Sequence, residues 1–319
     1  MKARHWVLLA VLVIVVAAIG PVIKDSLHGS AKKLGHDLDL GPARIAVLPL
    51  DGEIQSSEWT VRWLKRFGQE VRGVKAIVIA LDTPGGGVAP SQEICQAIYS
   101  LRDDGVVVVA SMGSLAASGG YYVASACDEI VADPGTVTGS IGVIMETMHV
   151  EKLLAKVGAQ FETIKSGEFK DSGSPYRAMV PRERALFQSA INDVYDQFVD
   201  AVAQGRHDAF ADVLARQTGR KAAAFSDAEI KAYTKKLADG RIYTGRQALD
   251  LGLVDTLGGM DDAIARAADL AGIKDPQVIT YREPKSIAEW MTGMSKTDMK
   301  AWVKQAFLSE GPRLNFLLR

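Results

Sequence analysis

Ser118 is the residue of this sequence best placed for nucleophilic chemistry. It stands in the stretch SLAASGGYYVASACDEIVA, directly before a pair of glycines, Gly119 and Gly120. The preceding run GVVVVASMGS predicts a buried strand, so we expect Ser118 where a strand passes into a helix. Backbone N–H groups are unpaired at such a helix start. The position suits a nucleophile, and it also suits an ordinary helix-capping serine.

A run of three glycines is the second candidate for chemistry. The segment LDTPGGGVAPSQEI places Gly85, Gly86 and Gly87 between an apolar strand and a helix. Such a loop exposes backbone N–H groups and admits another backbone at close range. It lacks the Gly-Lys-Ser/Thr ending of a P-loop and the glycine spacing of a dinucleotide-binding fingerprint. We therefore predict an oxyanion hole formed by the N–H groups of Gly86 and Gly119.

A nucleophilic serine needs a base, and two side chains are candidates. Of the five histidines, His149 is the one expected near the sheet, and an aspartate such as Asp171 would complete a triad with it. The alternative is Lys170, in the segment KSGEFKDSGSPYR, where glycine, serine and proline indicate a structured loop. Ser140 adds a further hydroxyl in a tight Gly-Ser turn. The residue types alone do not decide whether His149 or Lys170 is the base.

Alternating apolar strands and amphipathic helices must position these residues. Strands are expected at 44–50, 75–82, 106–111, 129–133, 142–145 and 160–166. Helices are expected at 59–71, 88–101, 116–126, 147–157 and 181–205, and then a turn, a helix, a strand and a helix over 240–272. This order predicts an α/β fold built from βαβ units, with a largely parallel sheet covered by helices.

Taken together, these segments resemble the core of signal peptide peptidase A, also called protease IV. The resemblance rests on MGSLAASGGYYVASACDEIVADPGTVTGSIGVI, LDTPGGGV, KSGEFKDSGSPYR and RIYTGRQALDLGLVD. It implies a Ser-Lys membrane peptidase of the short, single-repeat form. It also implies a crotonase-like fold, shared with the Clp protease proteolytic subunit, in which a ββα superhelix contains a parallel sheet.

The resemblance implies a role for each candidate residue. Ser118 would be the nucleophile, Lys170 the base, and Ser140 the residue that orients the lysine. The backbone N–H groups of Gly86 and Gly119 would bind the oxyanion. No metal ion or other cofactor is expected.

The expected activity is hydrolysis of peptide bonds by a membrane-anchored serine endopeptidase. The expected substrates are remnant signal peptides and other extended, hydrophobic peptides. The ring assemblies of the related proteins imply a homo-oligomer, in which Lys170 of one copy serves Ser118 of its neighbour. His149 is then expected to be an ordinary polar surface residue. The alternatives are a catalytically inactive, membrane-tethered scaffold of the same fold and a crotonase-like acyl-CoA enzyme.

The N-terminal region carries a strongly hydrophobic segment. WVLLAVLVIVVAAIGPVI, residues 6–23, holds no charged side chain and is about long enough to cross a bilayer. We expect an uncleaved anchor, because the apolar region of a cleaved signal peptide is usually shorter. Basic residues on its two sides nearly balance, so charge alone does not set the orientation. The resemblance implies the bacterial cytoplasmic (inner) membrane, with the catalytic domain on the extracytoplasmic side.

The rest of the sequence has the composition of an ordinary globular protein. Its formal net charge of −1 lacks the basic excess typical of nucleic-acid-binding proteins, so no nucleic-acid partner is expected. Cys95 and Cys127 match no metal-binding spacing and are expected to be free, buried thiols. We predict an anchor over 1–23, a polar tether over 24–43, a peptidase domain over 44–275 and a C-terminal amphipathic helical extension over 276–319.

Overall fold

The structure, a computed structural model, describes residues 43–69, 73–282 and 315–317. The predicted anchor over 1–23 lies outside these residues, as do residues 24–42 of the predicted tether and most of the helical extension predicted over 276–319. The described parts of that extension are not helical, because Gln277–Thr280 and Asn315–Leu317 are strands. Among the described residues, no helix is both long enough and apolar enough to cross a membrane.

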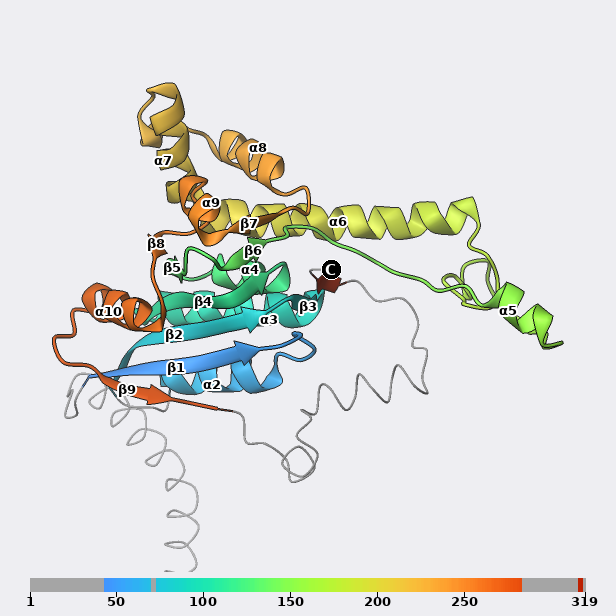
Figure 1. Cartoon of the computed structure of the whole chain (residues 1–319), viewed down its shortest axis with the longest axis horizontal. Helices are drawn as coiled ribbons and strands as arrows, with labels where there is room; N and C mark the ends of the chain where they lie inside the picture. Colours follow the sequence, from blue (N-terminus) through green and yellow to red (C-terminus); the bar gives the residue numbers. More distant parts are fainter. Residues whose placement is uncertain (1–42, 70–72, 283–314, 318–319) are drawn as a thin grey trace, which may run out of the picture. The chain divides into compact units, whose positions relative to one another are not determined.

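The apolar runs of the sequence lie side by side in one largely parallel sheet (Figure 1). β1 (Arg44–Asp51) lies between β2 (Val74–Thr83) and β9 (Gln277–Thr280), and β2 also pairs with β4 (Val107–Ala117). All three pairings are parallel. These strands are rich in valine, isoleucine and alanine because helices cover both faces of a parallel sheet. The predicted α/β class is confirmed.

The sheet branches at β4. β5 (Glu129–Ala132) runs parallel to the middle of β4, and β6 (Val137–Gly139) runs parallel to its end. β8 (Thr256–Leu257) pairs with β5, while β7 (Ile242–Thr244) runs antiparallel to β6. The register places Ala117, the last residue of β4, beside Gly139.

Helices pack on both faces of this sheet. α2 (Glu58–Gln69), α3 (Val88–Asp103) and α4 (Gly119–Ala124) share one core with the sheet, and α10 (Met260–Leu270) packs in a second core. Alternate residues of β1 enter the two cores, as the two-residue period of a strand requires.

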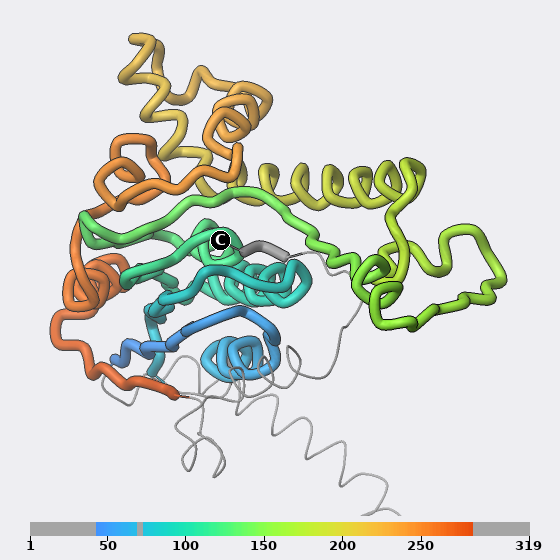
Figure 2. The backbone as a smooth tube through the Cα atoms, turned by 45° about the vertical axis from the view of Figure 1, so that its right-hand side comes forward, coloured from blue at the N-terminus to red at the C-terminus, as the bar shows by residue number. Residues whose placement is uncertain are grey.

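The second half of the chain adds a helical layer. α6 (Pro181–Gly205) buries apolar side chains near its C-terminal end, among them Phe198 and Val202. Its N-terminal half extends beyond the sheet toward α5 (Glu151–Lys156), as Figures 1 and 2 show. The remaining elements of this layer are α7 (His207–Thr218), the short 3₁₀ helix η1 (Ala222–Ala224), α8 (Asp227–Leu237) and α9 (Gly245–Asp250).

Four predicted elements need correction, and one of them is the helix predicted at 147–157, which forms only over Glu151–Lys156. Residues 142–145 do not form a strand, and the strand of this region is β6, immediately before them. Residues 160–166 do not form a strand either, because they are exposed and lie beside no other described strand. The helix predicted at 116–126 starts later, at Gly119, because β4 continues to Ala117 and pairs there with β6.

A buried ion pair ties the end of α6 to the sheet. Arg206 is 3% exposed, and its guanidinium donates to both carboxylate oxygens of Asp255 at 2.6 and 2.8 Å. It also donates twice to the carbonyl of Gly252, at 2.9 and 3.0 Å. Asp255 in turn accepts the N–H of Ile130 in β5 at 2.7 Å. One guanidinium therefore joins the helical layer to the sheet.

Arg206→Ala should lower the free energy of unfolding by about 3 kcal/mol, because Asp255 loses the cation that pairs with it and the carbonyl of Gly252 loses two donors. Arg182→Ala is the control, since Arg182 pairs with Glu168 at the surface and should change stability by less than about 1 kcal/mol. Urea denaturation of both variants measures the difference. Equal losses in the two variants would contradict a structural role for the Arg206 pair.

Candidate active site

Ser118 lies at the junction of β4 and α4, as the sequence predicts. Its backbone has φ 53° and ψ −115°, in a region that residues other than glycine rarely adopt. The residue is fully buried, and its Oγ has no hydrogen-bond partner among the described residues. The side chain makes no helix-capping hydrogen bond, so the interpretation as an ordinary capping serine fails. A strained turn with a buried, unpaired hydroxyl is typical of a reactive site.

Close packing explains a glycine after Ser118. A Cβ on Gly120 would lie 2.6 Å from Cγ2 of Thr83, so a larger residue would push α4 away from the end of β2. Oγ1 of Thr83 also accepts the N–H of Gly85 at 3.0 Å. The first turn of α4 is therefore held against the glycine segment, which forms the short strand β3 (Gly85–Gly87).

Gly86 lies between two backbones. On one side, the N–H of Ile54 donates to the carbonyl of Gly85, and the carbonyl of Ile54 accepts the N–H of Gly87, both at 2.8 Å. A Cβ on Gly86 would lie 2.3 Å from the carbonyl oxygen of Ile54, so only glycine fits here. Because Gly85 and Gly87 use that side, the N–H and C=O of Gly86 point toward the opposite edge of β3.

Another segment of the same chain occupies that opposite edge. β10 (Asn315–Leu317) pairs antiparallel with β3, and Phe316 stands opposite Gly86 (Figure 1). β10 also contacts α4, the helix that begins directly after Ser118. The edge of β3 therefore accepts an extended backbone close to the candidate nucleophile.

Ser118 and Ser140 follow the ends of neighbouring strands. The N–H of Ser118 donates to the carbonyl of Gly139 at 2.8 Å. Ser140 is 6% exposed and also has a left-handed backbone, with φ 50°, and its N–H donates to the carbonyl of Arg241 at 2.8 Å. The structure thus brings the candidate nucleophile beside the serine predicted to orient the lysine.

Lys170 lies apart from these two serines within the single chain. It belongs to a turn between α5 and α6, is exposed, and its side chain makes no hydrogen bond or ion pair with another described residue. Among the described residues, the polar contacts of residues 150–180 stay within this segment and the first turn of α6. Both views show the segment beyond the N-terminal end of α6, away from α4 (Figures 1 and 2).

The alternative triad does not form. Asp171 accepts hydrogen bonds from Nζ of Lys165 at 2.6 Å and from Nε of Arg177 at 2.8 Å, and these contacts lower the pKa of its carboxyl group. His149 is exposed and has no side-chain hydrogen bond to another described residue. A triad requires the imidazole to be held by the aspartate, and here the aspartate is held by two cations.

Sequence reasoning missed two features near the candidate residues. It did not anticipate strand β10, because the short segment NFL has no periodicity that would mark a strand. Arg177, within the segment KSGEFKDSGSPYR, is the second, because nothing in its residue type alone predicts a role. The adjacent acids and bases of that segment were the available signal.

Comparison with known families assigns these residues to a protein class. The family model described as peptidase family S49 matches residues 100–229 and 226–274, which include Ser118, Ser140 and Lys170. The chain belongs to peptidase family S49. It is therefore a peptidase, and the resemblance to signal peptide peptidase A is confirmed.

Three curated relatives of this S49 member are similar over most of their length. A protein of Synechocystis sp. is 43% identical over 227 residues, which are 70% of this chain and 74% of that protein. A protein of Methanocaldococcus jannaschii is 32% identical over 296 residues, covering 88% and 87%. One of Enterococcus faecium is 33% identical over 258 residues, covering 78% and 67%. The first two carry the name putative protease, and the third is named putative signal peptide peptidase SppA.

Two solved structures show a distant likeness to the S49 chain. The 1510-N membrane-bound stomatin-specific protease has a TM-score of 0.46 at 16% identity, covering 77% of this chain and 100% of that one. ClpP1 of Listeria monocytogenes has a TM-score of 0.41 at 15% identity, covering 68% and 94%. The fold described above rests on the strand pairing of this chain itself.

Proposed function

We propose that this S49 peptidase is a membrane-anchored serine endopeptidase with a dyad of Ser118 and Lys170. The observation that carries the proposal is the Ser118 hydroxyl, which is buried and unpaired on a strained turn. Such a turn costs stability, and in an inactive scaffold no catalytic function would offset that cost. A crotonase-like acyl-CoA enzyme would use carboxylates, and nothing about Ser118 serves that chemistry.

The reaction we propose is acyl transfer. Neutral Lys170 takes the proton of the Ser118 hydroxyl as Oγ attacks the peptide carbonyl. The N–H groups of Gly86 and Gly119 bind the oxyanion, and Gly119 offers its N–H because the first turn of a helix leaves such groups unpaired. Lys170, oriented by Ser140, then protonates the leaving amine and later activates the water that releases the acyl group.

The substrates we propose are extended, hydrophobic peptides, including remnant signal peptides. The edge of β3 pairs with an extended segment of the same chain, β10, directly beside α4. A substrate in place of β10 would add an antiparallel strand to β3 through main-chain hydrogen bonds. Such binding favours unfolded peptides, because a folded protein has few free strands of this kind.

We further propose a homo-oligomeric ring in which Lys170 of one copy reaches Ser118 of the next. Residues 144–186 carry ten of the fourteen exposed large hydrophobic side chains among the described residues. Apolar side chains gathered in one exposed region mark an interaction surface. A second copy packed against this region would bury them and would also place a Ser118 near the turn that carries Lys170.

The membrane location belongs to the same proposal. The hydrophobic segment over residues 6–23 would anchor the chain in the bacterial cytoplasmic membrane, with the peptidase domain on the extracytoplasmic side. This location would place the catalytic residues close to the signal-peptide remnants that we propose as substrates.

A serine-reactive fluorophosphonate should label the full-length chain at Ser118, because the proposed dyad makes this hydroxyl nucleophilic. Peptide mass spectrometry identifies the labelled residue. Ser118→Ala should remove the label, whereas Ser114→Ala, at an exposed serine near the end of β4, should leave it in place. An unlabelled wild-type chain, or a label on another serine, would contradict the proposed function.

A further inference from the structure

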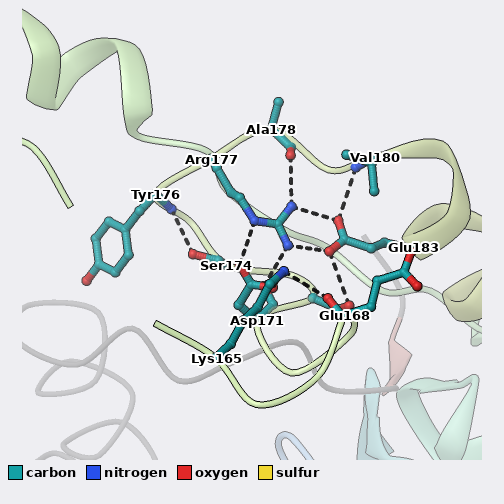
Figure 3. A network of polar contacts seen from close by, with 10 residues as sticks. Lys165, Glu168, Asp171, Ser174, Tyr176, Arg177, Ala178, Val180 and Glu183 are labelled. Carbon is teal, nitrogen blue, oxygen red and sulfur yellow. Dashed lines mark hydrogen bonds and ion pairs between the residues drawn. The ribbon is translucent and has the colours of Figure 1, made fainter. Parts of the chain in front are cut away.

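The turn that carries Lys170 is held by a set of ion pairs (Figure 3). Nζ of Lys165 donates to Oδ1 of Asp171 at 2.6 Å and to the carbonyl of Glu168 at 2.9 Å. Nε of Arg177 donates to Oδ2 of Asp171 at 2.8 Å, and its Nη2 donates to the carbonyl of the same residue at 3.2 Å. The backbone is therefore fixed on both sides of Lys170.

Arg177 also ties this turn to α6. Its two Nη atoms donate to the two carboxylate oxygens of Glu183, one pair at 2.9 Å. Glu183 is 2% exposed and also accepts the N–H of Val180 at 3.0 Å and the hydroxyl of Ser172 at 3.2 Å. These contacts, chiefly the hydrogen bonds from Arg177, lower the pKa of Glu183 to about 2. One guanidinium thus joins the residues after Lys170 to the first turn of a 25-residue helix.

The same pairs leave Lys170 without a carboxylate. Both oxygens of Asp171, its neighbour in sequence, are occupied by Lys165 and Arg177. Two further acids nearby are occupied as well, since Glu168 of the turn pairs with Arg182, and Glu183 of α6 pairs with Arg177. An ion pair with Asp171 would hold the Lys170 amine within the turn, where it could not reach a serine.

We propose that Arg177 is a positioning residue for Lys170. It fixes the turn to α6, and it occupies the carboxylate that would otherwise bind the lysine. The proposal rests on the proposed function, in which Lys170 is the base. Arginine suits the role because its planar fork serves two carboxylates at once and still donates to the carbonyl of Ala178 at 3.1 Å.

Arg177→Ala in the full-length chain should lower kcat on a fluorogenic peptide by at least about 10-fold. KM should change little, because the peptide binds at β3 and not at the turn. The matched control is Arg182→Ala, which also removes one cation paired with an acid of this turn. Arg182 is 77% exposed, so its loss should leave kcat within about two-fold of the wild-type value.

A second variant separates positioning from loss of fold. Adding Asp171→Asn to Arg177→Ala removes the carboxylate that would bind Lys170, so kcat should rise at least about three-fold above that of the single variant. A merely structural role for Arg177 predicts no such recovery, because the double variant has lost one more ion-pair partner. A double variant with no more activity than Arg177→Ala would therefore contradict the proposal.

Two results would overturn the inference directly: equal kcat values for Arg177→Ala and Arg182→Ala, or a loss confined to KM. Lys170→Ala is measured beside them. If Lys170→Ala keeps its activity, the proposed function itself is wrong. If Lys170→Ala is inactive while Arg177→Ala behaves like Arg182→Ala, the dyad stands and only the role of Arg177 is wrong.

Discussion

Ser118→Ala should lower kcat for peptide hydrolysis by more than about 10²-fold, because the variant keeps the oxyanion donors and loses the attacking oxygen. Stability should be unchanged or slightly raised. The Ser118 Oγ is buried and has no partner, so its removal costs no hydrogen bond and leaves no group unpaired. Turnover of a fluorogenic peptide and thermal unfolding of the same samples measure the two effects.

Ser125→Ala is the matched control for this experiment. Ser125 is also a fully buried serine of this region, at the C-terminal end of α4, but its hydroxyl donates to the carbonyl of Tyr122 at 2.8 Å. Its loss should lower the free energy of unfolding by about 1 kcal/mol and leave kcat nearly unchanged. Near wild-type turnover in Ser118→Ala would overturn the proposed mechanism. If Ser118→Ala loses as much stability as Ser125→Ala, the Ser118 hydroxyl is not an unpaired group.

The long apolar strands could be predicted because their sequences are nearly continuous in hydrophobic residues. β1, β2 and β4 are of this kind, and the structure confirms all three. The short strands β3, β7 and β10 escape prediction, since pairing with a neighbour, and not local sequence, makes them strands. The opposite error occurs at residues 160–166, where Phe161, Thr163 and Ile164 favour a strand by residue type but no partner strand is described.

The candidate residues divide in the same way. The junction that carries Ser118 could be predicted, because an apolar strand, a small residue and two glycines leave few alternatives. The position of Ser140 beside Ser118 could not be predicted. It depends on the pairing of β6 with the end of β4, and nothing in the sequences of these two segments indicates that they pair. The place of Lys170 depends on the path of α6, whose N-terminal half leaves the sheet. The apolar residues Phe187, Ile191, Val194, Phe198 and Val202 recur every three or four positions and favour packing along most of the helix.

Mixing two inactive variants should restore activity if the dyad forms between copies. A Ser118→Ala chain keeps its lysine, and a Lys170→Ala chain keeps its serine. When the two are unfolded together and reassembled in equal amounts, random assembly gives intact Ser118 next to intact Lys170 at about a quarter of the interfaces in a ring. Activity should therefore rise from background to roughly a quarter of the wild-type value, measured with the fluorogenic peptide.

The control replaces the Lys170→Ala partner with a chain that carries both substitutions. This mixture contains no intact Ser118, so it must stay inactive however the copies assemble. Co-assembly in each mixture is checked by affinity capture of one tagged variant and detection of the other. A captured but inactive mixture of the two single variants would place both residues of the dyad within one chain. The turn at Lys170 would then have to move toward α4 of its own chain, and the apolar residues of 144–186 would need another explanation.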